Sequence, residues 1–428
     1  MRGERCIDKL FSVCCCMFNL HLTSEQQAIR ETVREFTRNE IKPIAVERDR
    51  LEDFDARFPW EVLEKASRLG LRTLALSEKL GGSGADNLTS CIVTEELAVG
   101  DVGISATLGQ TSTLAHIWFD RLMTPEQRAR FLPQFLADDR FHLATAGHEP
   151  DTDLGWCYHR PTVPGAAYRT TAVKDNNGDW VINGVKNFIT SAPIAKLIAV
   201  HVRTGSKKSD TIGTSSLLVP HDAPGLTIRE HDKVGRRLGS NGELVFQDCR
   251  VPAENLLGEE GKSLFGAEVV GRRGPRFQAM NLGIGRAAYE AAMEYAKLRV
   301  QGGRPIIEHQ AVGLTLASMA IKLEAARILV WQAAWASDHP AAYADHSLPD
   351  LPLQAIAKVF VSETVQQVAL DAAQMFGGMG VMREMPMQKY VRDALIFLHS
   401  ECTNDVARLR IAEMLADYRR PQAAAAEE

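Results

Sequence analysis

The sequence lacks the short motifs that mark several common functional classes. Its 428 residues contain no C-x-x-C pair, no P-loop, no H-E-x-x-H and no G-x-G-x-x-G after a strand-like run. These absences argue against a zinc site, a nucleoside-triphosphate site and a dinucleotide-binding βαβ unit. We therefore predict no metal site.

Charge and long apolar runs are also scarce. The net charge is -5, without a basic tract of the kind that binds a phosphate backbone, so nucleic acid is not an expected partner. No apolar run reaches the roughly 18–20 residues of a membrane-spanning helix, which predicts a soluble protein with no membrane partner.

Cysteine is unevenly distributed. Four of the eight cysteines fall in the first sixteen residues, and the rest are scattered, which predicts reduced thiols and a cytoplasmic location. The basic, then apolar stretch Met1–Met17 allows two interpretations. It is either an organelle-targeting segment, or a disordered or mis-started extension with Met17 as the working start.

Changes of composition divide the chain into five parts. The first 21 residues form the extension, and the last eight form a loose tail. Between them we expect an α+β fold: helical, then antiparallel β (a barrel or packed sheets), then a helical bundle of four helices. The expected parts are 1–21, 22–140, 141–255, 256–420 and 421–428.

Local signals support this order. Thr23 with Gln26, and Thr124 with Gln127, form capping-box patterns that predict helix starts. In the middle, Thr, Val and Ile alternate with polar residues between the turn signals Asn177-Gly178, Asn183-Gly184 and Pro224-Gly225.

Two apolar stripes predict long helices of the bundle. One contains Val312, Leu316, Met319, Leu323, Ala326 and Val330. The other contains Ala287, Ala288, Ala291, Ala292, Tyr295 and Ala296. A third helix is expected around Ile356–Met375.

Several short segments have bland explanations when taken singly. The glycines after Gln374-Met375-Phe376 suit a helix C-cap, and a lone Glu in a polar loop such as Glu401 is usually a surface residue. Their order and spacing, from about Leu22 to about Leu415, resemble those of the FAD-dependent acyl-CoA dehydrogenase family. The segments that carry the resemblance are Leu244–Gly258, Arg299–Ile306, Glu308-His309-Gln310, Gln374–Gly380 and Arg392-Asp393-Ala394 before Glu401.

The resemblance implies how FAD is held. Arg299 and Gln310 should meet its diphosphate and adenosine half across a subunit boundary. Gln374, Gly377 and Gly378 should do the same from a neighbouring chain. Guanidinium and backbone N–H groups suit a diphosphate, and glycine lets the backbone approach it closely.

The same resemblance assigns residues to the flavin ring and the reaction. The Thr190 hydroxyl should face the flavin N5, and Phe188 should pack against the ring. Glu401 should be the base that removes the α-proton of an acyl-CoA thioester, and Thr403 belongs to the cofactor-binding turn after it. Burial beside an acyl chain should raise the pKa of Glu401 toward neutrality.

Some relatives carry the base earlier, on the first helix of the C-terminal bundle. Here that stretch reads Gly271-Arg272-Arg273-Gly274-Pro275-Arg276 and offers no carboxylate, which favours Glu401. If Glu401 were not the base, His148 and Glu149 would be the next candidates.

Three substitutions within family motifs indicate a divergent member with an unusual acyl group. His148 replaces a flavin-facing threonine, and its imidazole could still donate to a flavin carbonyl or N1. Cys402 replaces the glycine after the base, and Gly302 replaces an aromatic residue.

Two alternatives to a dehydrogenase stay open. One is another flavoenzyme on the same fold, such as a flavin monooxygenase or an acyl-CoA desulfinase. The other is a non-enzymatic assembly role. As a dehydrogenase, the chain should form a homotetramer or dimer and pass electrons to an electron-transfer flavoprotein.

Overall fold

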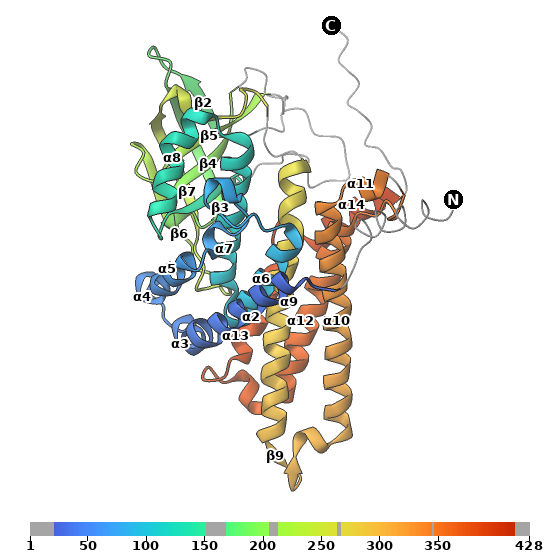
Figure 1. Ribbon diagram of the computed structural model, residues 1–428. Helices are drawn as coiled ribbons and strands as arrows, with labels where there is room; N and C mark the ends of the chain where they lie inside the picture. The colour runs from blue at the N-terminus through green and yellow to red at the C-terminus, as the bar shows by residue number, and fades with distance from the viewer. Residues whose placement is uncertain (1–20, 151–167, 205–212, 263–266, 345, 416–428) are drawn as a thin grey trace, which may run out of the picture.

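The computed structural model describes residues 21–150, 168–204, 213–262, 267–344 and 346–415, with no account of the side chains of 267–274. The expected N-terminal extension, apart from residue 21, and the C-terminal tail lie outside these ranges. Helices come first, a sheet follows, and a bundle of long helices ends the chain (Figure 1). This order confirms the predicted fold class. Within the described ranges, no helix combines the length and apolarity needed to cross a bilayer.

The N-terminal part is built from α-helices that pack around α6. Both predicted capping boxes are present: the Thr23 and Thr124 side chains accept from the backbone N–H of Gln26 and Gln127, whose side chains return the bond. Every residue of α6 is buried. The α-helices are α2 (Ser24–Phe36), α3 (Lys42–Asp49), α4 (Phe54–Arg57), α5 (Trp60–Arg68), α6 (Asn87–Gly100), α7 (Val102–Ala115) and α8 (Pro125–Ala137).

The middle part is an eight-stranded sheet in the order β6-β7-β3-β2-β4-β5-β8, with β1 beside β4. Its strands are β1 (His142–Ala146), β2 (Thr171–Lys174), β3 (Trp180–Thr190), β4 (Ala195–Arg203), β5 (Thr214–Pro220), β6 (Leu226–Glu230), β7 (Asn241–Val251) and β8 (Leu256–Leu257).

The prediction of a purely antiparallel sheet is wrong, because β4 pairs in parallel with both β1 and β2. Turn signals report only on consecutive strands. The strands β1 and β4 meet across two intervening strands, so no hairpin sets their relative direction.

One predicted turn is also wrong. Asn177-Gly178 and Pro224-Gly225 lie between strands as expected, but Asn183-Gly184 lies inside β3. Gly184 has φ +139°, and the pairing with β7 shifts register beside it. A Cβ on Gly184 would lie 2.6 Å from the Cα of Thr170, the residue just before β2, so this glycine serves a bulge and a close approach of the chain.

The C-terminal part is a bundle whose long helices lie side by side in Figure 1. Both predicted apolar stripes face its core: Leu316, Met319 and Leu323 on one helix and Ala288 and Ala292 on the other are buried. The helices are α9 (Ala267–Leu298), α10 (Gln310–Asp338), α11 (Ala341–Ala344), α12 (Leu353–Met375), α13 (Met387–His399) and α14 (Asn404–Leu415), with a small hairpin of β9 (Val300–Gln301) and β10 (Arg304–Pro305).

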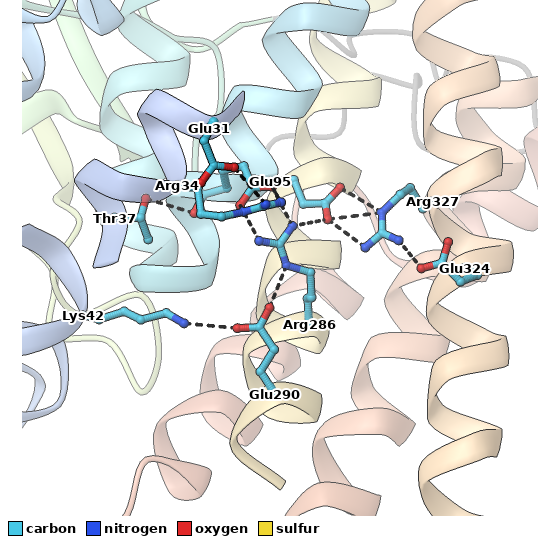
Figure 2. A network of polar contacts seen from close by, with 10 residues as sticks. Glu31, Arg34, Thr37, Lys42, Glu95, Arg286, Glu290, Glu324 and Arg327 are labelled. Atoms are coloured by element: carbon cyan, nitrogen blue, oxygen red, sulfur yellow. Dashed lines mark hydrogen bonds and ion pairs between the residues drawn. The ribbon is translucent and has the colours of Figure 1, made fainter. Parts of the chain in front are cut away.

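A buried ionic network joins the N-terminal helices to this bundle (Figure 2). Glu95 and Glu96 of α6 are 4% and 2% exposed. Arg286 of α9 pairs with both, Arg327 of α10 lies 3.0 Å from Glu95, and Arg34 of α2 lies 2.9 Å from Glu96. Burial raises the pKa of Glu96, but the two arginines more than offset it and leave that pKa below its usual range.

Candidate functional site

A cavity of about 1500 Å³ lies where the three parts of the chain meet. Residues of α6 and α7, of the ends of β1 and β3, of the 231–241 loop, and of α9, α12 and the turn after α13 line it. Six of the residues singled out from the sequence share this cavity: His148, Glu149, Phe188, Thr190, Glu401 and Cys402.

Glu401 lies in the turn between α13 and α14. It is exposed and has φ +65°, a left-handed conformation that is uncommon for a residue other than glycine. Ser400 and Cys402 line the cavity beside it. The burial of Glu401 expected from the sequence is therefore not seen in this chain.

Phe188 presents an exposed aromatic ring to the cavity. It is 69% exposed with φ +56°. The Asn187 carboxamide oxygen accepts from the Phe188 N–H at 2.8 Å and lies 2.6 Å from the His231 Nε2. The His231 ring lies behind, 5.3 Å from the Phe188 centroid. The local contacts therefore hold Phe188 with its ring facing outward.

Thr190 is the last residue of β3, two residues after Phe188. Gln110 of α7 donates to its backbone carbonyl at 2.9 Å, which ties the strand end to the N-terminal helices. Both Thr190 and Gln110 line the cavity. This hydrogen bond fixes the position of Thr190 relative to α7.

His148 follows β1 and is exposed at the cavity wall. Its carbonyl accepts from the Asn187 N–H at 2.9 Å. Although the residue is exposed to the cavity, the cavity wall partly desolvates its imidazole and lowers its pKa, and the nearby Lys186 ammonium adds to that effect. A neutral imidazole at this position can both donate and accept a hydrogen bond.

Glu149 is committed to a buried ion pair. Its carboxylate lies 2.7 Å from the Lys186 ammonium, with both side chains almost fully buried, and accepts from the N–H groups of Arg169 and Thr170 at 2.6 and 3.0 Å. Burial raises the Glu149 pKa, but Lys186 and these donors outweigh it, so that the pKa lies below its usual range. As a fallback base, Glu149 is therefore poorly suited.

The remaining candidates lie away from the cavity. Arg299, Gln310, Gln374, Gly377 and Gly378 are exposed and do not line it. Arg276 of α9 does line the cavity, and the 23 residues from there to Arg299 span roughly 35 Å of helix. One chain therefore does not bring these five residues to the cavity that contains Glu401.

The five distant residues lie where α9 ends, α10 begins and α12 ends, next to the small hairpin labelled β9 in Figure 1. Tyr295, one turn before Arg299, stacks on Phe376 with ring centroids 4.0 Å apart. Gly377 follows with φ +57°, and no atom lies within 4 Å of a Cβ built on Gly377 or Gly378. This end is an open surface.

Family models match most of the chain. The model for the acyl-CoA dehydrogenase N-terminal domain matches residues 23–139, that for the middle domain 164–249, and that for the C-terminal domain 275–416. The chain is 33% identical over 409 residues to the mitochondrial short-chain specific acyl-CoA dehydrogenase of Rattus norvegicus, covering 94% of this chain and 92% of that one. The chain belongs to the acyl-CoA dehydrogenase family.

Solved structures agree with this membership. The butyryl-CoA dehydrogenase of Megasphaera elsdenii has a TM-score of 0.81 at 32% identity, covering 93% of this chain and 100% of that one. An FAD complex of PigA has a TM-score of 0.79 at 25% identity, covering 93% and 99%.

Thr403 and Gly302, two further positions in the family motifs, do not line the cavity. The Thr403 hydroxyl accepts from the Val406 N–H at 3.4 Å at the start of α14. At Gly302, one of the three motif substitutions, φ is +63°, and the His309 ring lies 3.4 Å from a Cβ built there. His309 therefore lies directly beside this glycine.

Sequence reasoning missed several cavity residues of this acyl-CoA dehydrogenase. Lys358 of α12 and Arg276 of α9 are buried charged residues that line it. A lysine within the apolar run Ile356–Phe360 was a usable signal, because a charge in such a run needs a built partner. In the described part of the chain, His, Cys, Asp and Glu side chains form no group of three suited to a metal ion.

Proposed function

We propose that this chain is an FAD-dependent oxidoreductase that converts an acyl-CoA thioester to the 2-enoyl-CoA, with Glu401 as the catalytic base. The observation that supports it best is the shared cavity of Glu401, Phe188 and Thr190. A site for one small molecule is typically about 300–1000 Å³. A volume of about 1500 Å³ suits two ligands side by side, a flavin and a thioester.

The cavity wall fits a flavin. The exposed Phe188 ring offers an apolar face, and the hydroxyls of Thr190 and Thr145, with the Asn241 carboxamide, offer hydrogen bonds around it. We assign Phe188, Thr190 and His148 to the flavin ring. When bound, FAD supplies the acceptor for the hydride that leaves the substrate β-carbon.

Glu401 supplies the proton acceptor. A thioester α-proton is weakly acidic, so its removal needs a positioned carboxylate and hydrogen-bond donors directed at the thioester carbonyl oxygen. The exposed Glu401 can reach the substrate, and its backbone N–H is the expected donor to that oxygen. Bound substrate would displace water from Glu401 and raise its pKa.

A second chain completes the cofactor site in this proposal. The open end of the bundle with Arg299, Gln310, Gln374, Gly377 and Gly378 lies too far from its own cavity to share one FAD with it. We therefore propose that it binds the diphosphate and adenosine half of the FAD of a neighbouring subunit, in a homotetramer or dimer.

Two partners follow from the proposed chemistry. The substrate class is an acyl-CoA, and short straight chains are the first to try, since two relatives are named for short-chain or butyryl substrates. The sequence contains no nicotinamide fingerprint. The electron acceptor is therefore proposed to be an electron-transfer flavoprotein.

The deciding experiment replaces Glu401. Anaerobic stopped-flow absorbance would follow flavin bleaching by an acyl-CoA that reduces the parent protein. Glu401→Gln should keep the yellow colour and substrate binding but lose about 10²–10⁴ in the rate of bleaching, the usual value of a positioned base. Glu259→Gln, an exposed surface change, is the matched control and should bleach at the parent rate.

Two outcomes separate the alternatives. Bleaching of the Glu401→Gln variant within a few-fold of the parent would move the base elsewhere. A parent protein that binds flavin but is not bleached by any acyl-CoA without oxygen would instead favour a monooxygenase or desulfinase on this fold.

A further inference from the structure

Lys358 is a buried ammonium next to the proposed base. It lies on α12, is 4% exposed and lines the same cavity as Glu401. Its neighbours in α12 are mostly apolar core residues. A buried charge is costly unless it is well hydrogen-bonded, so the partners of this lysine identify its role.

The partners lie at both ends of the turn that contains Glu401. The Lys358 Nζ donates to the Phe397 carbonyl at 2.7 Å and to the Leu398 carbonyl at 3.4 Å, both in the last turn of α13. It also donates to the Asn404 Oδ1 at 2.7 Å, in the first residue of α14. A cation at the C-terminal end of a helix is favourable, because unpaired carbonyls concentrate negative charge there.

A second layer holds Asn404 in place. The Ser362 hydroxyl donates to the Asn404 Oδ1 at 3.1 Å, and the Asn404 Nδ2 donates to Glu363 at 3.0 Å. Arg408 of α14 pairs with the same Glu363 at 2.6 Å. Lys358, Ser362 and Glu363 all belong to α12, so one helix anchors both flanks of the turn.

We propose that Lys358 is a positioning residue for Glu401: its ammonium clamps the end of α13 to the start of α14 and so sets where the Glu401 carboxylate lies. The inference rests on the proposed function of Glu401. The backbone conformation of Glu401 shows why its turn needs such a clamp. Glu401 has φ +65°, and a non-glycine residue keeps that conformation only where its surroundings hold it.

The charges around Lys358 are consistent with this role. Burial lowers its pKa, and the nearby Cys402, Glu401 and Glu363 partly offset that effect. The ammonium is therefore close enough to the turn for its charge to be felt there. A purely structural lysine would stabilise the bundle without affecting the chemical step in particular.

The test compares Lys358→Met with Lys322→Met, a control at a half-exposed lysine of α10, each as FAD-loaded protein. We expect Lys358→Met to reduce flavin bleaching about 10²-fold, since small misplacements of a reacting group cost about this much. The dissociation constant for the acyl-CoA and the FAD content should stay within threefold of the parent. Lys322→Met should match the parent in all three measurements.

A double-mutant cycle distinguishes positioning from general stabilisation. In a Glu401→Gln background, Lys358→Met should cause a much smaller further loss of rate, since the carboxylate is already gone and only the backbone N–H of residue 401 is still displaced. A full additional 10²-fold loss there, or a Lys358→Met single variant within threefold of the parent, would overturn the inference.

A second variant tests the inference if Lys358→Met does not fold. Asn404→Ala removes one anchor but keeps the charge, and we expect about a tenfold loss with the same lack of additivity; a rate within twofold of the parent would overturn the inference. The proposed function fails separately, if Glu401→Gln itself bleaches at the parent rate.

Discussion

Glu401 and Phe188 each hold a backbone conformation that an ordinary side chain avoids. Six non-glycine residues in the described ranges have positive φ, and three of them, Phe188, Arg236 and Glu401, line the cavity. Each such conformation costs about 1–3 kcal/mol and persists where surrounding contacts enforce it. The contacts are present: Asn187 holds Phe188, and Lys358 holds both flanks of the Glu401 turn.

His142 is a buried residue whose protonation should destabilise the folded protein. It is fully buried at the start of β1, its Nδ1 lies 3.0 Å from the Thr111 hydroxyl, and burial, with help from Arg72, lowers its pKa to about 3. The unfolded pKa is about 6.5. The unfolded chain thus binds the proton more readily, and the stability that neutral His142 provides above pH 6.5 is lost as the pH falls toward 3.

The lowered pKa of His142 predicts how the stability of a variant should depend on pH. Between pH 7 and pH 5, titration of His142 should remove about 2 kcal/mol of unfolding free energy. His142→Gln keeps a partner for Thr111 and cannot titrate, so urea unfolding should show a pH slope smaller by that amount. The exposed His221→Gln is the control with an unchanged slope. Equal slopes for His142→Gln and the parent would contradict the assignment.

At the scale of elements, β3 depends on one glycine. Gly184 combines φ +139° with a close approach to Thr170, whereas Gly178, in the turn before β3, has φ +89° and no atom within 4 Å of a built Cβ. Comparing alanine substitutions at the two positions therefore separates the cost of backbone strain from the cost of steric overlap.

Alanine at these two glycines should give different costs. Gly178→Ala should lower the unfolding free energy by about 1 kcal/mol, from the unfavourable φ alone. Gly184→Ala should cost about 3 kcal/mol or more, because its Cβ would also overlap the backbone of Thr170, just before β2. Urea unfolding at one protein concentration measures both, and similar losses would rule out the overlap.

At the scale of the whole molecule, buried ion pairs hold the parts together. The Glu95–Glu96 network joins α2, α6, α9 and α10, and Lys389 of α13 lies 2.7 Å from Asp101 at the start of α7. The cavity lies between parts that are tied at these points. Its shape should therefore depend on residues that never touch a ligand.

Assembly and cofactor retention should change together at the open end of the bundle. If Arg299 binds a neighbour's FAD, Arg299→Ala should lower the FAD content of the purified protein and shift sedimentation toward smaller species. Arg38→Ala, an exposed arginine on the N-terminal helices, should change neither. A monomeric parent protein with full flavin content would contradict this arrangement.

Local sequence determined the elements and the family. The caps at Thr23 and Thr124 and the stripes of α9 and α10 depend on residues a few positions apart, and these predictions are confirmed. The ordered motifs also sufficed to predict the family, which the comparisons confirm. The roles of Glu401 and the flavin-facing residues stay predictions.

Only the tertiary structure decided which groups meet. Glu149 and Lys186 are 37 residues apart, and Lys358 and Asn404 are 46 apart, so no spacing in the sequence reveals either contact. The parallel pairing of β1 with β4 and the bulge at Gly184 likewise depend on distant strands. Helix caps and apolar stripes are set by neighbours along the chain, whereas ion pairs, strand order and a shared cavity are set by packing between segments far apart in it.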